Sequence, residues 1–490
     1  MTVPADAKVT DAYEMVIGLE VHCQLKTVTK AFCGCRTSFG DAPNANTCPV
    51  CLGLPGALPV LNAHAVELAT IASLALGCTM HERSIFARKN YFYPDLPKGY
   101  QISQFDQPLA TAGQLDVGLK REGEPVVIGI TRVHMEEDAG KSVHDRFRTD
   151  SAIDLNRSGT PLIEIVSEPD IRSSAEAGAY VRTLKQILEY VDVSDANMEE
   201  GSLRVDVNIS ARLRGATELG TRTEVKNLNS INGVERSVEI EFARQCRVLA
   251  SGGTIVQQTM LWDGHKDEIR PARSKEASHD YRYFPEPDLP PLKLTAAWIA
   301  AKRAGLPELP QARRNRFATQ YGFPAVDIEV LTATPAMAAR FETIAATSGD
   351  ARRAANWVLG PLQASSNATG IAMESHPLSA ERLGQLIRME VEGKISNTAA
   401  RQLFAMMETP EHQNADPLKL AESAGLLKVS DDSALQTWIN EVIAEFPEEA
   451  RRYLGGEAKL QGVLVGHVMR KSKGSADPQR LNQLLSARRA

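Results

Sequence analysis

Four prolines within seven residues, from Pro285 to Pro291, divide this chain into two parts of different character. Proline fixes φ and has no N–H to donate, so we expect an extended connector at this point. The sequence before it is rich in Gly, Pro and Asn, with short runs in which apolar and polar residues alternate. From Thr295 onward, Ala, Leu, Arg and Glu recur with helical periodicity. The connector therefore marks the first domain boundary.

This division predicts three domains. We expect a mixed α/β or α+β domain at 1–293 built on a largely antiparallel sheet, then an all-helical domain at 294–409 and a helical tail domain at 410–490. The second boundary follows a predicted helix at 397–408 and precedes a polar stretch. Within the first domain, Ser173 and Glu176 form a capping-box pattern, which predicts that a helix begins there.

The charge of the chain is unevenly distributed. The net charge of the 490 residues is −6, yet from Arg451 to Ala490 nine Lys and Arg stand against two acids, a net +7. Attraction to phosphate depends on the local field, so this end predicts a contact with a polyanion. The alternative is an ordinary solvated helical surface.

The sequence gives no sign of export or membrane insertion. No apolar run approaches the roughly 18 residues that a membrane span needs, and the first residues lack the basic and apolar pattern of a signal peptide. Seven cysteines, an odd number in such a chain, argue against disulfides. We expect a cytoplasmic protein without membrane contact.

Four of the cysteines form two close pairs. Cys33 and Cys35 give C-x-C and, after twelve residues, Cys48 and Cys51 give C-x₂-C. Two loops that present four thiolates suit tetrahedral zinc, and a site with all four positions filled would be structural. The alternative is four reduced cysteines near a surface loop. Redox catalysis is less favoured, since no thioredoxin-like βαβ pattern surrounds the pair.

Carboxylates recur on several predicted strands. Glu20 and His22 share one face of the alternating run 16–25, although a half-exposed strand would look the same. Glu164 lies in an apolar run, where a buried carboxylate needs a cation or good donors. Such oxygen ligands suit Mg²⁺. The remaining acids of this kind are Glu136, Glu137, Asp138 and Asp206.

The sequence contains no phosphate-binding P-loop, so any ATP site must be of another kind. Arg88, Lys89 and Lys98 surround the aromatic run 90–93 and can supply positive charge to a nucleotide. The aromatic run can stack RNA bases, but packing in the core is the favoured interpretation.

At these same residues the sequence resembles the B subunits of glutamyl/aspartyl-tRNA amidotransferases, over nearly the whole chain. The matching motifs are Val16–His22 (VIGLEVH), Arg88–Gln104 (RKNYFYPDLPKGYQISQ), His134–Lys141 (HMEEDAGK), Asp154–Asp170 (DLNRSGTPLIEIVSEPD), Met198–Leu203 (MEEGSL), Glu224–Asn232 (EVKNLNSIN), Asp280–Asp288 (DYRYFPEPD) and Gly462–Leu485 (GVLVGHVMRKSKG…NQLL).

The resemblance implies a two-step reaction. ATP with Mg²⁺ phosphorylates the side-chain carboxylate of Glu on tRNA(Gln) or of Asp on tRNA(Asn). Ammonia, released from glutamine in a partner A subunit, then displaces the phosphate, and a small C subunit completes the complex. Phosphorylation provides the leaving group that a bare carboxylate lacks.

The resemblance also implies an α+β fold in which a cradle domain on a mixed, largely antiparallel sheet is followed by a helical domain and a helical tail. It assigns roles by position as well. His22, Glu137 and Glu164 correspond to the magnesium ligands and, with Glu20, to the catalytic residues; Glu136 can exchange roles with Glu137. Lys89, Lys98 and Asp206 correspond to the lining of an ammonia tunnel or active site. In the tail, Arg470, Lys471 and Lys473 are the expected tRNA contacts.

Two other interpretations stay open. The chain can be a non-catalytic tRNA-binding module with a zinc knuckle, in which the inward acids are structural. It can also be an unrelated metal-dependent hydrolase, which fares worse because the sequence shows no nucleophile positioned beside its base.

Overall fold

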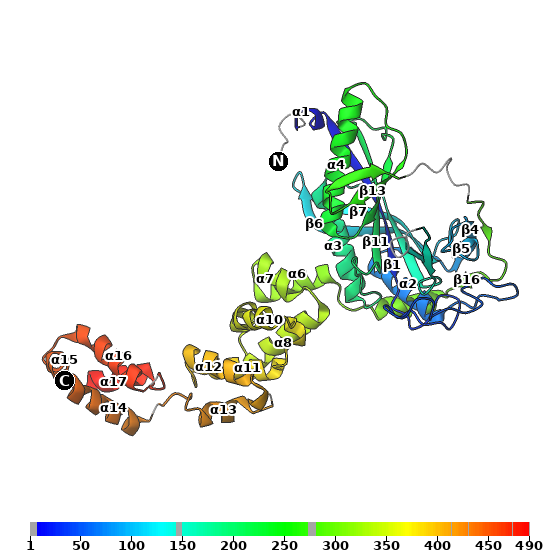
Figure 1. The fold of residues 1–490 in the computed structure, drawn as a ribbon. Coiled ribbons are helices and arrows are strands. Elements are labelled where there is room, and N and C mark those ends of the chain that lie inside the picture. The colour runs from blue at the N-terminus through cyan, green and yellow to red at the C-terminus, as the bar shows by residue number, and fades with distance from the viewer. Residues whose placement is uncertain are drawn as a thin grey trace. The chain divides into compact units, whose positions relative to one another are not determined.

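The computed structural model describes residues 7–143, 149–272, 281–412, 414–429, 431–472 and 474–489. Two compact units make up the chain, Met1–Pro310 and Gln311–Ala490. The first carries the sheet and the second is helical (Figure 1). Among the described residues, no helix combines the length and apolar character needed to cross a membrane.

Within the described part of the first unit, twelve strands form one sheet. The order β14-β13-β12-β11-β1-β10-β7-β5-β4-β15 is extended by β6 beside β7 and β2 beside β6. Only β12 and β13 pair in parallel among these described strands, and the other pairs are antiparallel. The predicted α+β fold with a largely antiparallel sheet is confirmed.

The strands have the following bounds: β1 (Tyr13–Gln24), β2 (Thr79–Met80), β4 (Ala87–Asn90), β5 (Tyr100–Ser103), β6 (Ala110–Arg121), β7 (Glu124–Glu137), β10 (Pro161–Ser167), β11 (Leu203–Leu213), β12 (Thr223–Leu228), β13 (Thr259–Asp263), β14 (Glu268–Pro271) and β15 (Phe284–Pro285). Two separate small pairs are β3 (Arg83–Ser84) with β16 (Leu292–Lys293), and β8 (Lys141–Val143) with β9 (Ala152–Asp154).

The central strand β1 shows why the sheet has one apolar and one polar face. Its side chains alternate, so Leu19, Val21 and Cys23 are buried on one side, while Glu20 and His22 lie on the other. The helices α2 (Ala63–Ala75), α3 (Ser174–Tyr190) and α4 (Ile231–Ala250) contribute to the core cluster on the apolar side. Burying each such aliphatic side chain contributes about 1.5–3 kcal/mol. The core thus fixes the direction in which the polar side chains point.

Helix α3 begins where the capping-box pattern predicts. The Ser173 side chain accepts a hydrogen bond from the backbone N–H of Glu176 at 3.2 Å. The Glu176 carboxylate in turn accepts one from the backbone N–H of Arg172 at 2.7 Å. The first bond satisfies an amide that has no partner within the first turn of the helix, and the second fixes the residue that precedes the N-cap.

The remaining helices lie before and after the connector. The first unit also holds α1 (Ala7–Thr10) and α5 (Ala296–Ala304); the helices numbered after it are α6 (Pro310–Tyr321), α7 (Ala325–Leu331), α8 (Pro335–Ser348), α9 (Ala351–Trp357), the π-helix η1 (Val358–Leu362), α10 (Gln363–Thr369), η2 (Met373–Ser375), α11 (Ala380–Val391), α12 (Asn397–Met407), η3 (Pro410–His412), α13 (Pro417–Ser423), α14 (Asp432–Glu445), α15 (Pro447–Leu454), η4 (Ala458–Leu460), α16 (Gln461–Lys471) and α17 (Pro478–Arg488).

In the part of the second unit that the structure describes, the buried hydrophobic residues form two clusters. One surrounds Phe341 and Leu383 and includes Leu420 of α13, and the other surrounds Leu435 and Leu481. The first unit continues through α5, whose Ile299 packs in the sheet's core. The domain boundaries at 293 and 410 stay predictions.

Candidate active site

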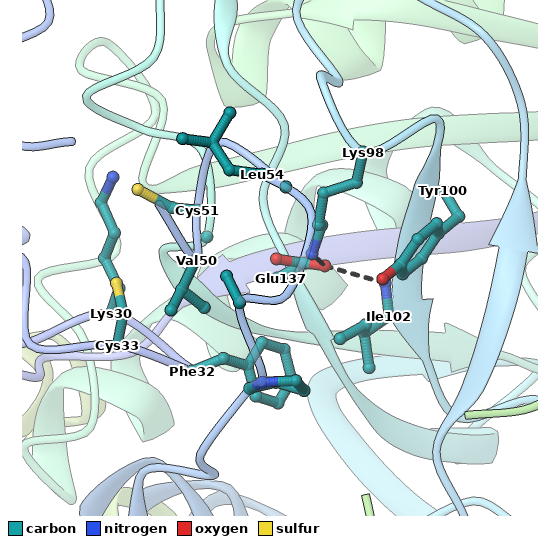
Figure 2. A pocket seen from close by; sticks show the side chains of 14 residues that line it. Lys30, Phe32, Cys33, Val50, Cys51, Leu54, Lys98, Tyr100, Ile102 and Glu137 are labelled. Carbon is teal, nitrogen blue, oxygen red and sulfur yellow. Dashed lines mark hydrogen bonds and ion pairs between the residues drawn. The ribbon is translucent and has the colours of Figure 1, made fainter. Parts of the chain in front are cut away.

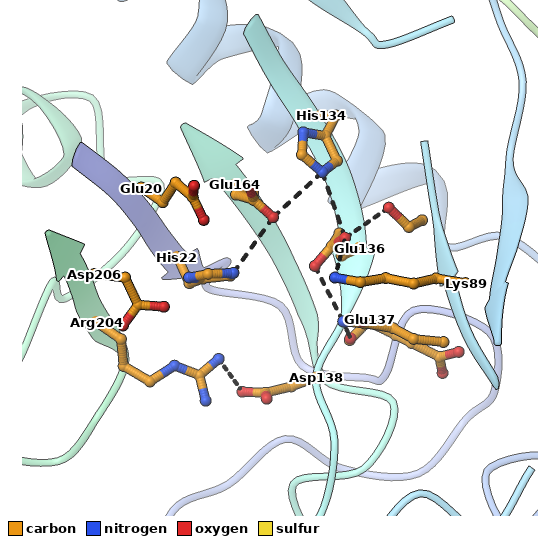
Figure 3. A network of polar contacts seen from close by, with 12 residues as sticks. Glu20, His22, Lys89, His134, Glu136, Glu137, Asp138, Glu164, Arg204 and Asp206 are labelled. Atoms are coloured by element: carbon orange, nitrogen blue, oxygen red, sulfur yellow. Dashed lines mark hydrogen bonds and ion pairs between the residues drawn. The ribbon is translucent and has the colours of Figure 1, made fainter. Parts of the chain in front are cut away.

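Strand register brings polar side chains from four strands to one face of the sheet. On β1, His22 pairs with Glu164 of β10 on one side and with Arg204 of β11 on the other. Glu164 pairs in turn with His134 of β7. Residues that are direct partners in neighbouring antiparallel strands point to the same face. The row therefore lies on the face opposite the buried apolar side chains; Figure 3 shows its polar side chains close together.

Two histidines and two carboxylates meet in the middle of this row. Nε2 of His22 lies 3.4 Å from Oε2 of Glu164. Nε2 of His134 lies 3.4 Å from the same oxygen and 3.4 Å from Oε1 of Glu136. His22, Glu136 and Glu164 each offer one ligand atom, and these atoms lie within 4.8 Å of one another. We call these three residues the imidazole–carboxylate cluster.

The charges of this cluster depend on each other. Burial favours a neutral Glu164, but His134 and His22 outweigh it and lower the pKa of Glu164 well below its ordinary value. Burial likewise favours a neutral His134, and the carboxylates of Glu164 and Glu136 raise the pKa of His134 to about 9 despite it. The carboxylates therefore stay ionised and can serve as oxygen ligands for a cation.

Glu136 is held in this cluster by three neighbours. Its carboxylate accepts hydrogen bonds from Oγ of Ser103 at 2.6 Å and from Nε2 of Gln101 at 3.0 Å. Nζ of Lys89 lies 4.0 Å from Oε1 of Glu136. Burial disfavours the ammonium form of Lys89, but the charge of Glu136, together with those of other acidic neighbours such as Glu164, outweighs burial and raises the pKa of Lys89. Lys89 thus lies beside the cluster.

The structure does not bring Glu137 to His22 and Glu164, and this corrects its expected placement. Successive residues of a strand point to opposite sides, so Glu137 turns away from the cluster that Glu136 joins. Glu137 pairs with Nζ of Lys98 and accepts the backbone N–H of Ile102 at 3.0 Å. The alternative that the sequence left open, with Glu136 facing the cluster, fits the geometry.

Glu137 and Lys98 line a cavity of ≈ 120 Å³ on the side of the cysteine loop (Figure 2). Phe32, Cys51 and the fully buried Lys30 also line it. The cavity therefore joins two features that are separate in the sequence, the acidic run of β7 and the cysteine pairs.

A second group of carboxylates lies further along the same sheet. Glu20, Asp206 and Glu224 each bring one oxygen to within 4.8 Å of the others. Nζ of Lys226 lies 2.7 Å from Asp206 and 3.0 Å from Glu224. Burial, and next the charge of Glu164, raise the pKa of Glu20. Sequence reasoning included Glu20 and Asp206 but missed the two residues of β12, although they open a motif that matched the family.

Sequence reasoning also missed the roles of His134 and Asp138. The buried Asp138 accepts hydrogen bonds from Arg204 at 2.9 Å and from Gln24 at 2.7 Å. These bonds connect the end of β7 to β11 and β1 at one end of the row. His134 bridges Glu136 and Glu164. The signal for His134 was its position two residues before Glu136, since such residues share a face of a strand.

The four cysteines come together as the spacing predicts. The Sγ atoms of Cys33, Cys35, Cys48 and Cys51 lie within 4.8 Å of one another, and all seven cysteines are free thiols. The sulfurs of Cys48 and Cys51 are 3.9 Å apart. Two sulfurs at tetrahedral positions around zinc would be about 3.8 Å apart, given a Zn–S distance of about 2.3 Å. The group can hold a metal ion.

The predicted tRNA contacts of the tail differ in their surroundings. Arg470 is exposed at the end of α16. Lys471 pairs with Glu441 at 3.1 Å and with Glu445, so part of its charge is already compensated. Lys473 lies outside the described residues.

The aromatic run before Pro94 does not pack in the core, which corrects the favoured interpretation. Phe92 is 89% exposed and Tyr93 is 40% exposed, while Tyr91 is half-buried. Tyr and Phe have high strand and core propensities, but these residues follow β4 as a surface loop.

Comparison with known proteins shows which family the chain resembles. Residues 15–300 match the family described as the GatB/GatE catalytic domain, and residues 339–488 match the GatB domain. A relative from Chlorobium chlorochromatii, the B subunit of an aspartyl/glutamyl-tRNA(Asn/Gln) amidotransferase, is 50% identical over 96% of this chain and 98% of its own. Relatives of the same name from Trichlorobacter lovleyi and Solidesulfovibrio magneticus are 49% and 48% identical, over 98% and 96% of this chain and 99% and 98% of theirs.

The first match alone covers more than half of the chain, and it includes every residue of the imidazole–carboxylate cluster. The full-length similarity extends through the tail. This chain belongs to the family formed by the B subunits of aspartyl/glutamyl-tRNA(Asn/Gln) amidotransferases.

Proposed function

We propose that this chain is the subunit of a glutamine-hydrolysing, tRNA-dependent amidotransferase that activates the side-chain carboxylate of a misacylated tRNA. Its substrates are Glu-tRNA(Gln), Asp-tRNA(Asn) or both, together with ATP. It works in the cytoplasm with a glutaminase A subunit and a small C subunit. The observation that carries this proposal is the imidazole–carboxylate cluster on the polar face of the sheet, in a chain of this family.

The residues of the cluster fit a magnesium ion. Glu136 and Glu164 supply anionic oxygens in a buried setting, and His22 supplies a ring nitrogen from the neighbouring strand. A bound Mg²⁺ would neutralise charge on the phosphoryl group during its transfer. His134 would hold both carboxylates in place through its Nε2. Residues that hydrogen-bond to metal ligands usually orient those ligands in this way.

The cations around the row suit an anionic substrate. Lys89, Arg204 and Lys226 stand beside Glu136, Asp138 and Asp206, respectively. Together they offset the many carboxylates, so that ATP and the substrate carboxylate are not repelled. In the first step a substrate oxygen takes the γ-phosphoryl group and ADP leaves. In the second step ammonia nitrogen bonds to the acyl carbon, and phosphate departs with the oxygen it received.

Glu137 and Lys98 have a different role in this proposal. They line the cavity next to the cysteine loop, and a polar cavity suits the passage of ammonia by successive hydrogen bonds. The carboxylate of Glu137 can take a proton from an ammonium ion, which leaves ammonia with the lone pair that the second step requires. Asp206 belongs on the opposite flank, with the second carboxylate group.

Two further assignments complete the proposal. Zinc bound by Cys33, Cys35, Cys48 and Cys51 would be structural, and it would shape the cavity that Cys33 and Cys51 help to line. The tail would contact tRNA phosphates through Arg470, Lys471 and Lys473. Arg470 is the strongest of these candidates, because it is exposed while Lys471 is shared with two glutamates.

The test is amide formation on Glu-tRNA(Gln) and Asp-tRNA(Asn) by this chain assembled with its A and C partners. ATP, Mg²⁺ and ammonium chloride are supplied, so that glutamine hydrolysis is not needed. We expect product from the wild type and none from Glu164→Gln. Glu14→Gln is the matched control, since Glu14 lies on β1 in an ion pair with Arg212 away from the cluster. Equal product from Glu164→Gln and wild type would leave this chain as a tRNA-binding protein without a catalytic role.

A further inference from the structure

Five aromatic side chains form a continuous band beside the active-site row. Phe105 stacks on Tyr283 with ring centroids 4.0 Å apart and an angle of 4° between the planes. Tyr283 meets Tyr281 at 5.9 Å, Tyr281 meets Tyr91 at 5.9 Å, and Tyr91 meets Tyr93 at 6.0 Å, each pair edge to face. We call these five residues the aromatic band.

The band is a surface and not a piece of the core. Phe105 is 46% exposed and Tyr93 is 40% exposed, and its other rings are partly exposed. Beyond Tyr93 the surface continues into an open hollow of ≈ 450 Å³ that Phe92 and Lys98 also line. The exposed parts of these rings stay in contact with water in the folded chain, so a ligand that covers them buries that remaining apolar area.

Two side chains connect the band directly to the imidazole–carboxylate cluster. Nζ of Lys89 lies 5.2 Å from the centre of the Tyr281 ring and 4.0 Å from Oε1 of Glu136. The hydroxyl of Tyr91 donates to Oε1 of Gln101 at 3.3 Å, and Nε2 of Gln101 donates to Glu136 at 3.0 Å. The band therefore begins one side chain away from the residues proposed to activate the substrate.

The backbone that carries the band is fixed to the sheet. Asn90 of β4 donates its side-chain amide to the carbonyl oxygens of Tyr281 at 3.1 Å and Arg282 at 2.9 Å. Its own N–H donates to the carbonyl of Tyr281 at 3.0 Å. Glu286, four residues after Arg282, forms a two-point ion pair with Arg88, which lies on β4 like Asn90. The rings are thus held in place before any ligand binds.

We propose that the aromatic band binds the unpaired nucleotides at the aminoacylated 3′ end of the tRNA by stacking on their bases. This inference rests on the proposed function and adds a substrate-binding site to it. Unpaired bases stack on aromatic side chains regardless of sequence, and single-stranded sites combine such rings with cations that accompany the backbone. Lys89 and the exposed Arg282 supply positive charge at the band.

The geometry favours the 3′ end over the adenine of ATP. The amino acid is esterified to the terminal nucleotide, so when its carboxylate reaches the cluster that nucleotide must lie about one amino-acid length away. The band has this position. It also offers a row of rings on an open surface, which suits several consecutive bases, whereas a single adenine would need only one ring.

The experiment uses the assembled complex with A and C partners and tRNA(Gln) that carries 2-aminopurine at its 3′-terminal position. Stacking lowers the fluorescence of 2-aminopurine, so this readout needs no catalysis. The variants are Phe105→Ala, Phe105→Leu and Tyr283→Ala, and Phe105→Tyr and Tyr283→Phe keep the ring. Phe284→Ala is the matched control, because Phe284 is 45% exposed and lies over Arg88 and not in the band. KM is measured separately for Glu-tRNA(Gln) and for ATP.

We expect the fluorescence decrease to be lost in the Ala and Leu variants and kept in the ring-preserving variants and the control. In the Ala and Leu variants, KM for Glu-tRNA(Gln) should rise about tenfold, as expected for one lost base stack, while KM for ATP stays unchanged. A rise in KM for ATP in its place would assign the band to the nucleotide and overturn the proposal. Unchanged fluorescence and KM in Phe105→Ala and Tyr283→Ala would also overturn it.

The proposed function and the base-stacking site can fail separately. If the wild-type complex forms no amide, the proposed function fails, whatever the fluorescence shows. If the wild type forms amide but the band variants match it in every readout, only the base-stacking site fails. A thermal unfolding midpoint equal to that of wild type identifies the variants that remain folded. If Phe105→Ala does not fold, Phe105→Leu serves in its place, because leucine keeps a large apolar side chain at this position.

Discussion

The ion pair between Arg88 and Glu286 should stabilise the first unit far more than an average salt bridge. The Glu286 side chain is 0% exposed and the Arg88 side chain is 20% exposed, and two parallel hydrogen bonds of 2.7 and 2.8 Å join them. Replacing Glu286 by Gln leaves a largely buried guanidinium without its main counter-charge. Removing one partner of a buried pair costs about 3–5 kcal/mol.

We expect the lower end of this range, about 3 kcal/mol, because Arg88 keeps two other neighbours. Asp288 lies 3.1 Å from its guanidinium, and the ring of Tyr100 lies 4.2 Å below it. A unit of this size shifts its Tm by about 2 °C for each kcal/mol, so Glu286→Gln should lower the Tm by roughly 6 °C.

The assay is thermal unfolding of the assembled complex, with Asp267→Asn as the matched control. Asp267 pairs with Arg236 at 2.9 Å, but both side chains are about half exposed. Such a pair contributes about 0.2–1 kcal/mol, so the control should change the Tm by less than about 2 °C. The double variant Arg88→Met, Glu286→Leu should recover most of the loss, because it leaves no unpaired charge. A Tm of Glu286→Gln equal to that of the control would refute this reasoning.

Three further outcomes are expected. Cys48→Ser should lower the zinc content, measured by mass spectrometry of the purified chain, from one ion per chain to almost none; unchanged zinc would exclude this cysteine as a ligand. Lys98→Met should reduce glutamine-supported amide formation more than ammonium-supported formation, because ammonium from solvent does not need the cavity; equal losses would contradict the proposed route. Burial is the main reason that the pKa of His376 is lowered, so below about pH 6.5 the unfolded chain binds more protons than the folded one. Stability should then fall from about pH 7 to about pH 5, and less steeply in His376→Gln, as thermal unfolding would show; identical slopes would contradict it.

The alternation of apolar and polar residues in β1 could be predicted from the sequence because it is a local property. Apolar Leu19, Val21 and Cys23 alternate with polar Glu20 and His22, and this period fixes which side chains share a face before any partner strand is known. The role of Glu164 could be predicted for a related reason, since a single carboxylate in an apolar run needs a partner. The cysteine spacing was equally local, and the four sulfurs do meet.

The distinction between Glu136 and Glu137 required register, which is not local. Two successive acids on a strand point to opposite faces, and only the pairing of His134 with Glu164 determines which of them faces the cluster. The contribution of Glu224 and Lys226 depends in the same way on where β12 pairs with β11. The aromatic run was wrongly expected to pack in the core because exposed and buried aromatic runs have the same composition.

The central claim is that Glu136, with His22 and Glu164, serves phosphorylation of the substrate carboxylate, while Glu137 serves the later entry of ammonia. The most direct measurement is release of ADP from ATP by the assembled complex with Glu-tRNA(Gln), in the absence of glutamine and ammonium. We predict that Glu136→Gln abolishes the tRNA-dependent release and that Glu137→Gln retains it, although the latter forms little amide when glutamine is added. Undiminished ADP release by Glu136→Gln, or its loss in Glu137→Gln alone, would contradict the assignment.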